Sequence, residues 1–99
     1  MLSADSVFIV DWPNSEITED FKFSCVHPDG VFTFTFKYFN DRWNAWAELP
    51  SGEIRAFGVL PNVVSWTGYI DYAIFFSTSL TTIDFDSLPS TQLIIVKWE

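Results

Sequence analysis

The segment VFTFTFKY, residues 31–38, decides the fold, because an aromatic residue stands at every second position along it. Successive side chains of a β-strand point to opposite faces, so a period of two is typical of a strand with one buried face. Phenylalanine has no polar group with which it could bind a sugar. We therefore expect Phe32, Phe34 and Phe36 to lie in the core of the protein, with the threonines between them facing water.

Short runs with the same period lie on both sides of this segment, and turn residues separate them. We expect strands at residues 6–12, 21–26, 31–38, 43–49, 54–60, 69–78 and 92–98. Turn sequences at 27–30, 40–42 and 50–53 are short enough to join consecutive antiparallel strands. The sequence therefore predicts an all-β domain, a small antiparallel barrel or sandwich of about six to seven strands in meander-like order, with little helix.

Two of the expected strands are apolar on both faces. Ile74, Phe75 and Phe76 are consecutive, and so are Ile94, Ile95 and Val96. Such strands lie in the middle of a sheet or in a contact with another protein.

Two segments lack a clear period of two. Residues 61–68 fit either one helical turn or an irregular loop, and we expect residues 77–90 to form a polar loop with a short turn at 86–88.

Composition limits the classes of protein to which the chain can belong. Its 99 residues predict a single domain, residues 1–99, and 48% hydrophobic with 19% aromatic residues is enough for a core. Five basic against 13 acidic residues make nucleic acid and anionic membranes poor partners. The first residues contain no Lys or Arg before Lys22, so we expect no signal peptide and folding in a cytoplasm.

The residues that carry catalysis in other proteins are sparse here. Cys25 and His27 could share one side of a strand, but they lack an orienting group, and we expect His27 to be a solvent-exposed turn residue. The same pair supplies only two ligands for zinc. Asp84 and Asp86 would point the same way in an extended chain, as paired carboxylates or as a weak calcium site. We expect no enzyme, no cofactor and no metal.

The tryptophans offer an alternative to a purely structural role. Trp and Tyr rings beside polar groups bind sugars by stacking. Trp43, Trp46 and Trp66 are the candidates for such a surface, although a core or a subunit contact is the simpler interpretation of each. The alternative function is therefore a small carbohydrate-binding or adhesin-like β module.

Residues 21–99 resemble the small baseplate hub plug proteins of contractile-tailed bacteriophages, a family named after a cyanophage plug. The matching features are Tyr38 with Asn40 in a turn, Trp46 with Glu48 on the next strand, Gly52 in a turn, the segment Gly58–Leu60, and the apolar strand Leu93–Val96. Residues 61–66 depart from the pattern, since a polar glycine-containing turn and a pair of leucines would be expected there.

The resemblance implies a structural protein of the virion, without catalytic residues, in the tail baseplate. Its partners would be hub, tail-tube or tape-measure proteins, with a threefold set of copies as one arrangement. It would be assembled in the host cytoplasm and would bind neither nucleic acid nor membrane. The candidate interface residues are Trp46, Pro61, Asn62, Val63, Val64, Trp66, Ile94, Val96 and Trp98.

Overall fold

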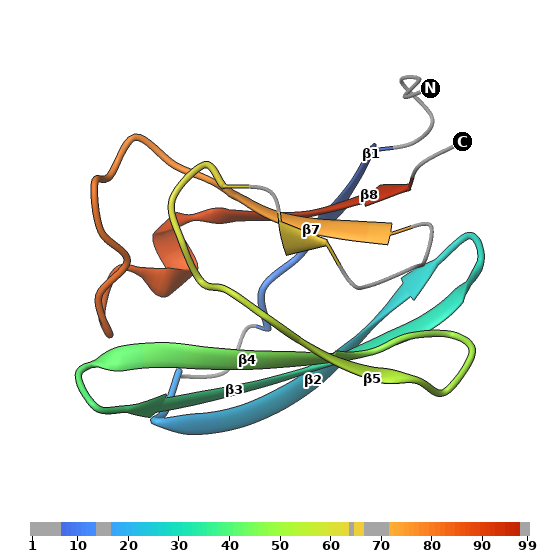
Figure 1. The fold of residues 1–99 in the computed structure, drawn as a ribbon, viewed down its shortest axis with the longest axis horizontal. Coiled ribbons are helices and arrows are strands. Elements are labelled where there is room, and N and C mark those ends of the chain that lie inside the picture. Colours follow the sequence, from blue (N-terminus) through green and yellow to red (C-terminus); the bar gives the residue numbers. More distant parts are fainter. Residues whose placement is uncertain (1–6, 14–16, 64, 67–71, 98–99) are drawn as a thin grey trace.

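Two antiparallel sheets of four strands each pack face to face as a sandwich (Figure 1). The structure is a computed structural model that describes residues 7–13, 17–63, 65–66 and 72–97, and for residues 65 and 66 the backbone alone. The expected all-β class is confirmed. Of the two architectures considered, the sandwich is the one observed, because the described strands do not close into a barrel.

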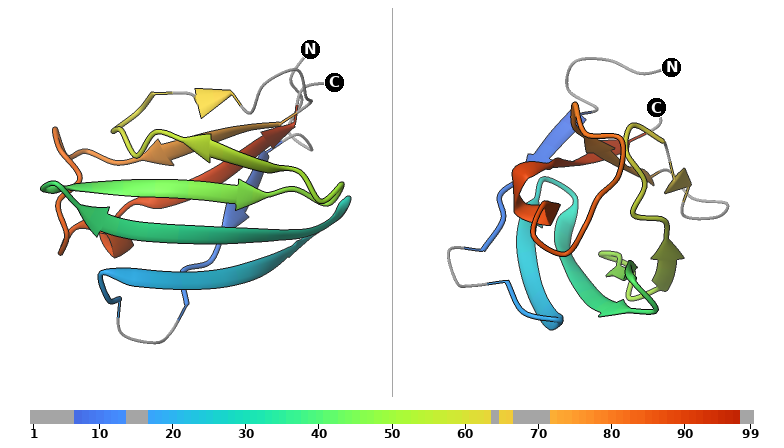
Figure 2. Two further views of the ribbon diagram at one scale, coloured as in Figure 1. Left: turned by 60° about the horizontal axis from the view of Figure 1, so that its bottom comes forward. Right: turned by 90° about the vertical axis from the view of Figure 1, so that its left-hand side faces the viewer.

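The first sheet, called the meander sheet below, has its strands in sequence order. It consists of β2 (Asp20–His27), β3 (Gly30–Phe39), β4 (Arg42–Glu48) and β5 (Ile54–Phe57). The register pairs Phe23 with Phe34, and Phe34 with Ala47. The expected hairpins are therefore present, and Figure 2 shows the four strands as one twisted layer.

The second sheet joins the two ends of the chain. Its order is β1 (Val7–Val10), β8 (Gln92–Lys97), β7 (Tyr72–Ser77) and β6 (Ser65–Trp66). A meander does not describe this sheet, because β1 pairs with β8 from the opposite end of the sequence. β8 lies between β1 and β7, which confirms the central position expected for a strand with two apolar faces.

Several strand limits differ from the expected ones. β1 ends at Val10 and β5 at Phe57, each earlier than the period of two suggested. The segment 61–68, for which a helical turn and a loop were both considered, contributes the short strand β6. A 3₁₀ helix, η2 (Leu88–Ser90), follows a turn in the loop between β7 and β8. These are local effects of pairing and packing that propensity does not encode.

Two turns of the meander sheet depend on unusual backbone geometry. Asn40 and Asp41, between β3 and β4, both have positive φ, 56° and 58°. This pair of angles is that of the tight hairpin turn whose twist matches the strands, and Asn and Asp tolerate it. Gly30 has φ 138°, and a Cβ placed there would lie 2.8 Å from Cβ of Pro50. The turn between β2 and β3 therefore needs glycine at this position.

The three phenylalanines of β3 form the centre of the core, as expected. Phe32, Phe34 and Phe36 are completely buried. The ring of Phe36 lies 6.3 Å from that of Phe76 on β7, so β3 packs directly against the second sheet. The remaining buried apolar residues of the cluster are Val10, Trp43, Ala45, Ala47, Leu49, Phe57, Ile74, Phe76, Leu88, Leu93 and Ile95.

The position of His27 contradicts the sequence-based expectation of an exposed turn residue. His27 is the last residue of β2 and only 6% exposed. Its ring packs against Phe8 and Phe32, with centroid distances of 5.0 and 5.1 Å. The alternation that turns Phe23 and Cys25 inward continues through His27, so the strand extends one residue into the predicted turn.

We expect Phe34→Ala to lower the free energy of unfolding by about 3–5 kcal/mol, because it leaves a cavity in a fully packed core. Thr35→Ala, on the opposite face of the same strand, should cost about 1 kcal/mol or less. Urea unfolding followed by near-ultraviolet circular dichroism measures both. Equal losses for the two variants would contradict the assignment of the inner face.

Candidate functional site

The outer face of the second sheet is apolar across three strands. Ile74, Phe76, Leu93 and Ile95 point into the core, so the residues between them point outward. The register aligns Ile9 of β1 with Ile94 of β8, and Ile94 with Phe75 of β7. These three side chains form one continuous row on the outside of the molecule.

A second row lies beside the first. Val7 pairs with Val96, and Val96 pairs with Ala73. Val7 is 48% and Ile9 52% exposed, whereas Phe75, Ile94 and Val96 are half-buried. Ala73 is completely buried, so it is not part of the surface. The five residues Val7, Ile9, Phe75, Ile94 and Val96 are called the apolar face below. None of them carries a polar group.

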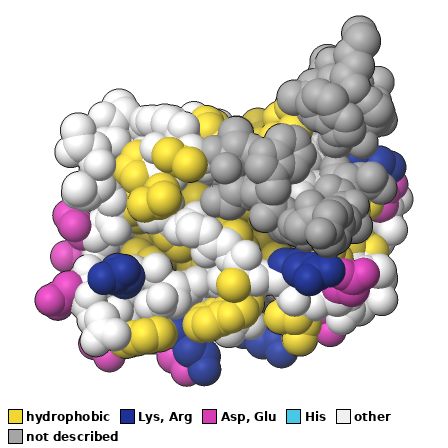
Figure 3. All heavy atoms as spheres, in the orientation of Figure 1, with side chains coloured by type: hydrophobic (Ala, Val, Ile, Leu, Met, Phe, Trp, Pro, Cys, Tyr) yellow, Lys and Arg dark blue, Asp and Glu magenta, His cyan; other side chains and the backbone are white. Residues whose placement is uncertain are grey.

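The outer face of the meander sheet has a different composition. Its outward positions on β2 include Asp20, Lys22 and Ser24, and β3 contributes Thr33, Thr35 and Lys37. In the space-filling view of Figure 3 most charged side chains lie over the lower half of the molecule, where β2–β5 run. This face also exposes four apolar side chains, Val26, Val31, Phe39 and Ile54, each between 49% and 78% exposed. The two outer faces therefore differ in the charged and hydroxyl side chains of the meander sheet, and not in the presence of exposed apolar residues.

The nine residues predicted as an interface do not form one surface. Ile94 and Val96 lie in the apolar face. Trp46 lies on the outer face of the opposite sheet, where it pairs with Thr35 and Ala56. Val64 and Trp98 lie outside the described residues, and of Trp66 only the backbone is described, paired with Ala73.

Val7, Ile9 and Phe75 belong to the apolar face but were not predicted as interface residues. The signal was in the sequence. The segment 7–10, VFIV, is apolar on both faces of the strand, like the two strands that were predicted to be central or in a contact for that reason. What the sequence could not show is that β1 pairs with β8 and so extends the same surface.

Pro61, Asn62 and Val63 lie in a connection that is held firmly to β7. The backbone N–H of Asn62 donates to the carbonyl of Phe76 at 2.8 Å. Its side-chain Nδ2 donates to the carbonyl of Thr78 at 2.7 Å, and its Oδ1 accepts from the N–H of Thr78 at 3.3 Å. Val63 is 48% exposed. The connection is therefore an ordered feature with an exposed apolar side chain.

The tryptophan candidates for a sugar-binding surface differ in burial. Trp43 is 5% exposed, its Nε1 donates to the carbonyl of Asp84 at 3.0 Å, and its ring stacks on Phe85. It is a core residue and too deeply buried to stack on a sugar. Trp46 is half-buried and borders a hollow of about 340 Å³ that Arg42 and Asn44 also line.

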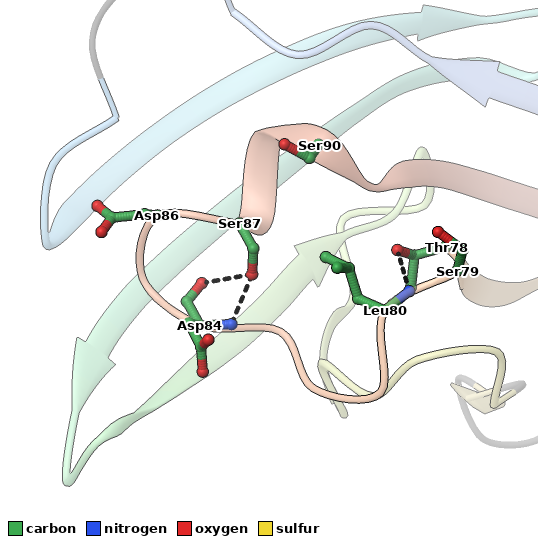
Figure 4. Close-up of a pocket in the computed structure, with 7 residues that line it drawn as sticks. All are labelled: Thr78, Ser79, Leu80, Asp84, Asp86, Ser87 and Ser90. Carbon is green, nitrogen blue, oxygen red and sulfur yellow. Dashed lines mark hydrogen bonds between the residues drawn. The ribbon is translucent and has the colours of Figure 1, made fainter.

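The two carboxylates considered as a catalytic or calcium-binding pair do not face each other. Asp84 and Asp86 line a hollow of about 450 Å³ in the loop between β7 and β8 (Figure 4). The Oγ of Ser87 accepts from the N–H of Asp84 at 2.7 Å, so this segment is a turn, and Figure 4 shows the carboxylates pointing in different directions. The parallel arrangement expected of an extended chain is absent.

Among the described residues no group of three or more His, Cys, Asp or Glu side chains is arranged to hold a metal ion. No helix in the described part of the chain is long and apolar enough to cross a membrane. A scan against protein-family models and searches of curated proteins and of solved structures give no match to this chain.

We expect Asn62→Ala to lower the free energy of unfolding by about 1–2 kcal/mol, because it removes both side-chain hydrogen bonds to Thr78 and places alanine at φ 56°. Asn62→Gly removes the same bonds but accepts the positive φ, and should cost less. Urea unfolding measures the difference. Equal stability of wild type and the alanine variant would contradict the role of this side chain.

Proposed function

We propose that this chain is a non-enzymatic structural protein that works through protein–protein contacts, with the apolar face as its principal interface. The observation that carries the proposal is the unbroken apolar register from Ile9 through Ile94 to Phe75. Isolated exposed aliphatic residues are ordinary on protein surfaces. A contiguous patch across three strands is typical of a surface that another protein covers.

We further propose that the assembly is the baseplate hub of a contractile phage tail. The resemblance of residues 21–99 to the hub plug family supports this placement. The net charge of −8 supports it as well, since an acidic protein does not hold DNA by attraction as the genome passes through the hub. The partners in this proposal are hub, tail-tube or tape-measure proteins, and further copies of the chain.

The alternative function is carbohydrate binding at Trp46. The observation that favours it is the hollow beside this half-buried ring, which Arg42 and Asn44 line with hydrogen-bond donors. Stacking on Trp46 and donation from Arg42 are the contacts that a sugar ring would use. Quenching of tryptophan fluorescence by soluble sugars, with saturation and loss in Trp46→Ala, would favour this function over assembly.

The assembly proposal is tested by co-expression with the proteins encoded by the adjacent reading frames, followed by affinity purification. Ile9→Lys should weaken the complex by about tenfold or more, because it places a charge on the most exposed residue of the apolar face. Val31→Lys is a matched control, since Val31 is 51% exposed, close to the 52% of Ile9, but lies on the opposite sheet. It should leave the complex intact.

Two outcomes would contradict the proposal. Equal effects of Ile9→Lys and Val31→Lys would remove the apolar face from the interface. Adjacent reading frames that encode no tail-tube, tape-measure or baseplate protein would remove the placement in a phage tail. Both variants substitute exposed positions, so circular dichroism should show the wild-type fold in each.

A further inference from the structure

A polar cluster joins the two sheets at the end of the sandwich where β2 turns into β3. Asp29 lies in this turn. Its Oδ2 accepts from Nζ of Lys97 on β8 at 2.8 Å and from the hydroxyl of Tyr72 on β7 at 2.5 Å. One carboxylate of the meander sheet thus receives hydrogen bonds from two strands of the second sheet. Hydrogen bonds to an ionised acceptor are among the stronger ones in proteins.

His27 is the second partner of this turn. Its Nδ1 accepts a hydrogen bond of 3.0 Å from the backbone N–H of Asp29. A ring nitrogen accepts only when it carries no proton, so this bond requires neutral imidazole with the proton on Nε2. The ring is 6% exposed and packs against Phe8, Phe32 and Tyr72. The bond that shapes the turn therefore depends on the protonation state of one buried side chain.

Among the described residues, the charged and titratable groups that face His27 are Asp29, Tyr72 and Lys97. Tyr72 comes from β7 and Lys97 from β8, while β1 and β3 contribute the rings of Phe8 and Phe32. Burial lowers the pKa of His27 below its usual value of 6.5, the Asp29 carboxylate raises it, and Lys97 lowers it. Hydrogen bonds from Lys97 and Tyr72 lower the pKa of Asp29 below its usual value of 3.8 and so favour its ionised form.

We propose that His27 and Asp29 form an acid-sensitive latch between the two sheets: when His27 takes up a proton, the β2–β3 turn is released from β7 and β8 while the sandwich stays folded. This inference does not depend on the proposed function or on the partners of the apolar face.

The mechanism follows from the geometry of the turn. A proton on Nδ1 turns that nitrogen into a donor, which then faces the N–H of Asp29 with no acceptor between them. The new imidazolium lies 4.0 Å from Oδ2 of Asp29, the atom that holds Lys97 and Tyr72. It competes with both for the carboxylate. Satisfying the protonated ring therefore moves the turn away from the second sheet.

The direction of the pH dependence follows from the lowered pKa of His27. The unfolded chain binds the proton more readily than the folded one, so this contribution to stability is fully present above pH 6.5. This contribution is lost as the pH falls through the pKa that His27 has in the folded state. Asp29 acts in the same direction at lower pH, below its usual pKa of 3.8.

The chain contains a single histidine, so its ring protons report the titration directly in the NMR spectrum of the wild-type protein. We expect a midpoint below 6.5. Over the same range, exchange of the Asp29 and Gly30 amides, corrected for intrinsic rates, should accelerate by about tenfold or more. Amides of β4 should keep their protection. Unchanged protection of the turn amides through the histidine titration would overturn the proposal, and so would simultaneous loss in β4.

His27→Gln supplies a carbonyl that can accept the Asp29 N–H but does not titrate, so the acceleration of exchange between pH 7.5 and 5 should disappear. If this variant does not fold, Tyr72→Phe tests the same point. This variant removes one of the hydrogen bonds that hold the turn against the second sheet while His27 is neutral. The titration midpoint of His27 should therefore move upward. Tyr38→Phe is the matched control at the other end of β3, against Trp43 and Phe85. The same shift in both tyrosine variants, or none in either, would overturn the latch.

Discussion

Burial of the β3 phenylalanines between two sheets is the constraint on which the rest of the structure depends. A strand with Phe32, Phe34 and Phe36 on one face must have that face covered, because each of these rings would otherwise expose roughly 150–250 Å² of surface to water. Neighbouring strands of the same sheet cannot do this. The cover comes from β7 and β8, through Phe76, Leu93 and Ile95.

This requirement does not account for the apolar outer face of the second sheet. The inner residues of β7 and β8 are needed to cover β3, but Phe75, Ile94 and Val96 point the other way and contribute nothing to that core. A surface sheet of a soluble protein usually alternates apolar with polar residues. The apolar residues on both faces of β7 and β8 are therefore the basis of the proposed assembly role.

The polar cluster at the β2–β3 turn works on a different principle from the core. The core is held by the hydrophobic effect, which has no directional preference. Asp29, in contrast, accepts hydrogen bonds of defined geometry from one amine and one hydroxyl. Because such bonds are directional, they define how the end of the meander sheet lies on the second sheet. They also connect that contact to a proton, through the neutral ring of His27.

The sequence by itself determined the class of fold, the inner face of β3, the hairpins of the meander sheet and the two strands that are apolar on both faces, because alternation and turn chemistry are local properties of the chain. Only the tertiary structure decided that β1 pairs with β8, that His27 is buried and that Trp43 is a core residue. The extent of the apolar face and the contact of Asp29 with Tyr72 and Lys97 depend on that pairing. They join residues far apart in sequence, and no local pattern encodes which distant strand will supply the partner.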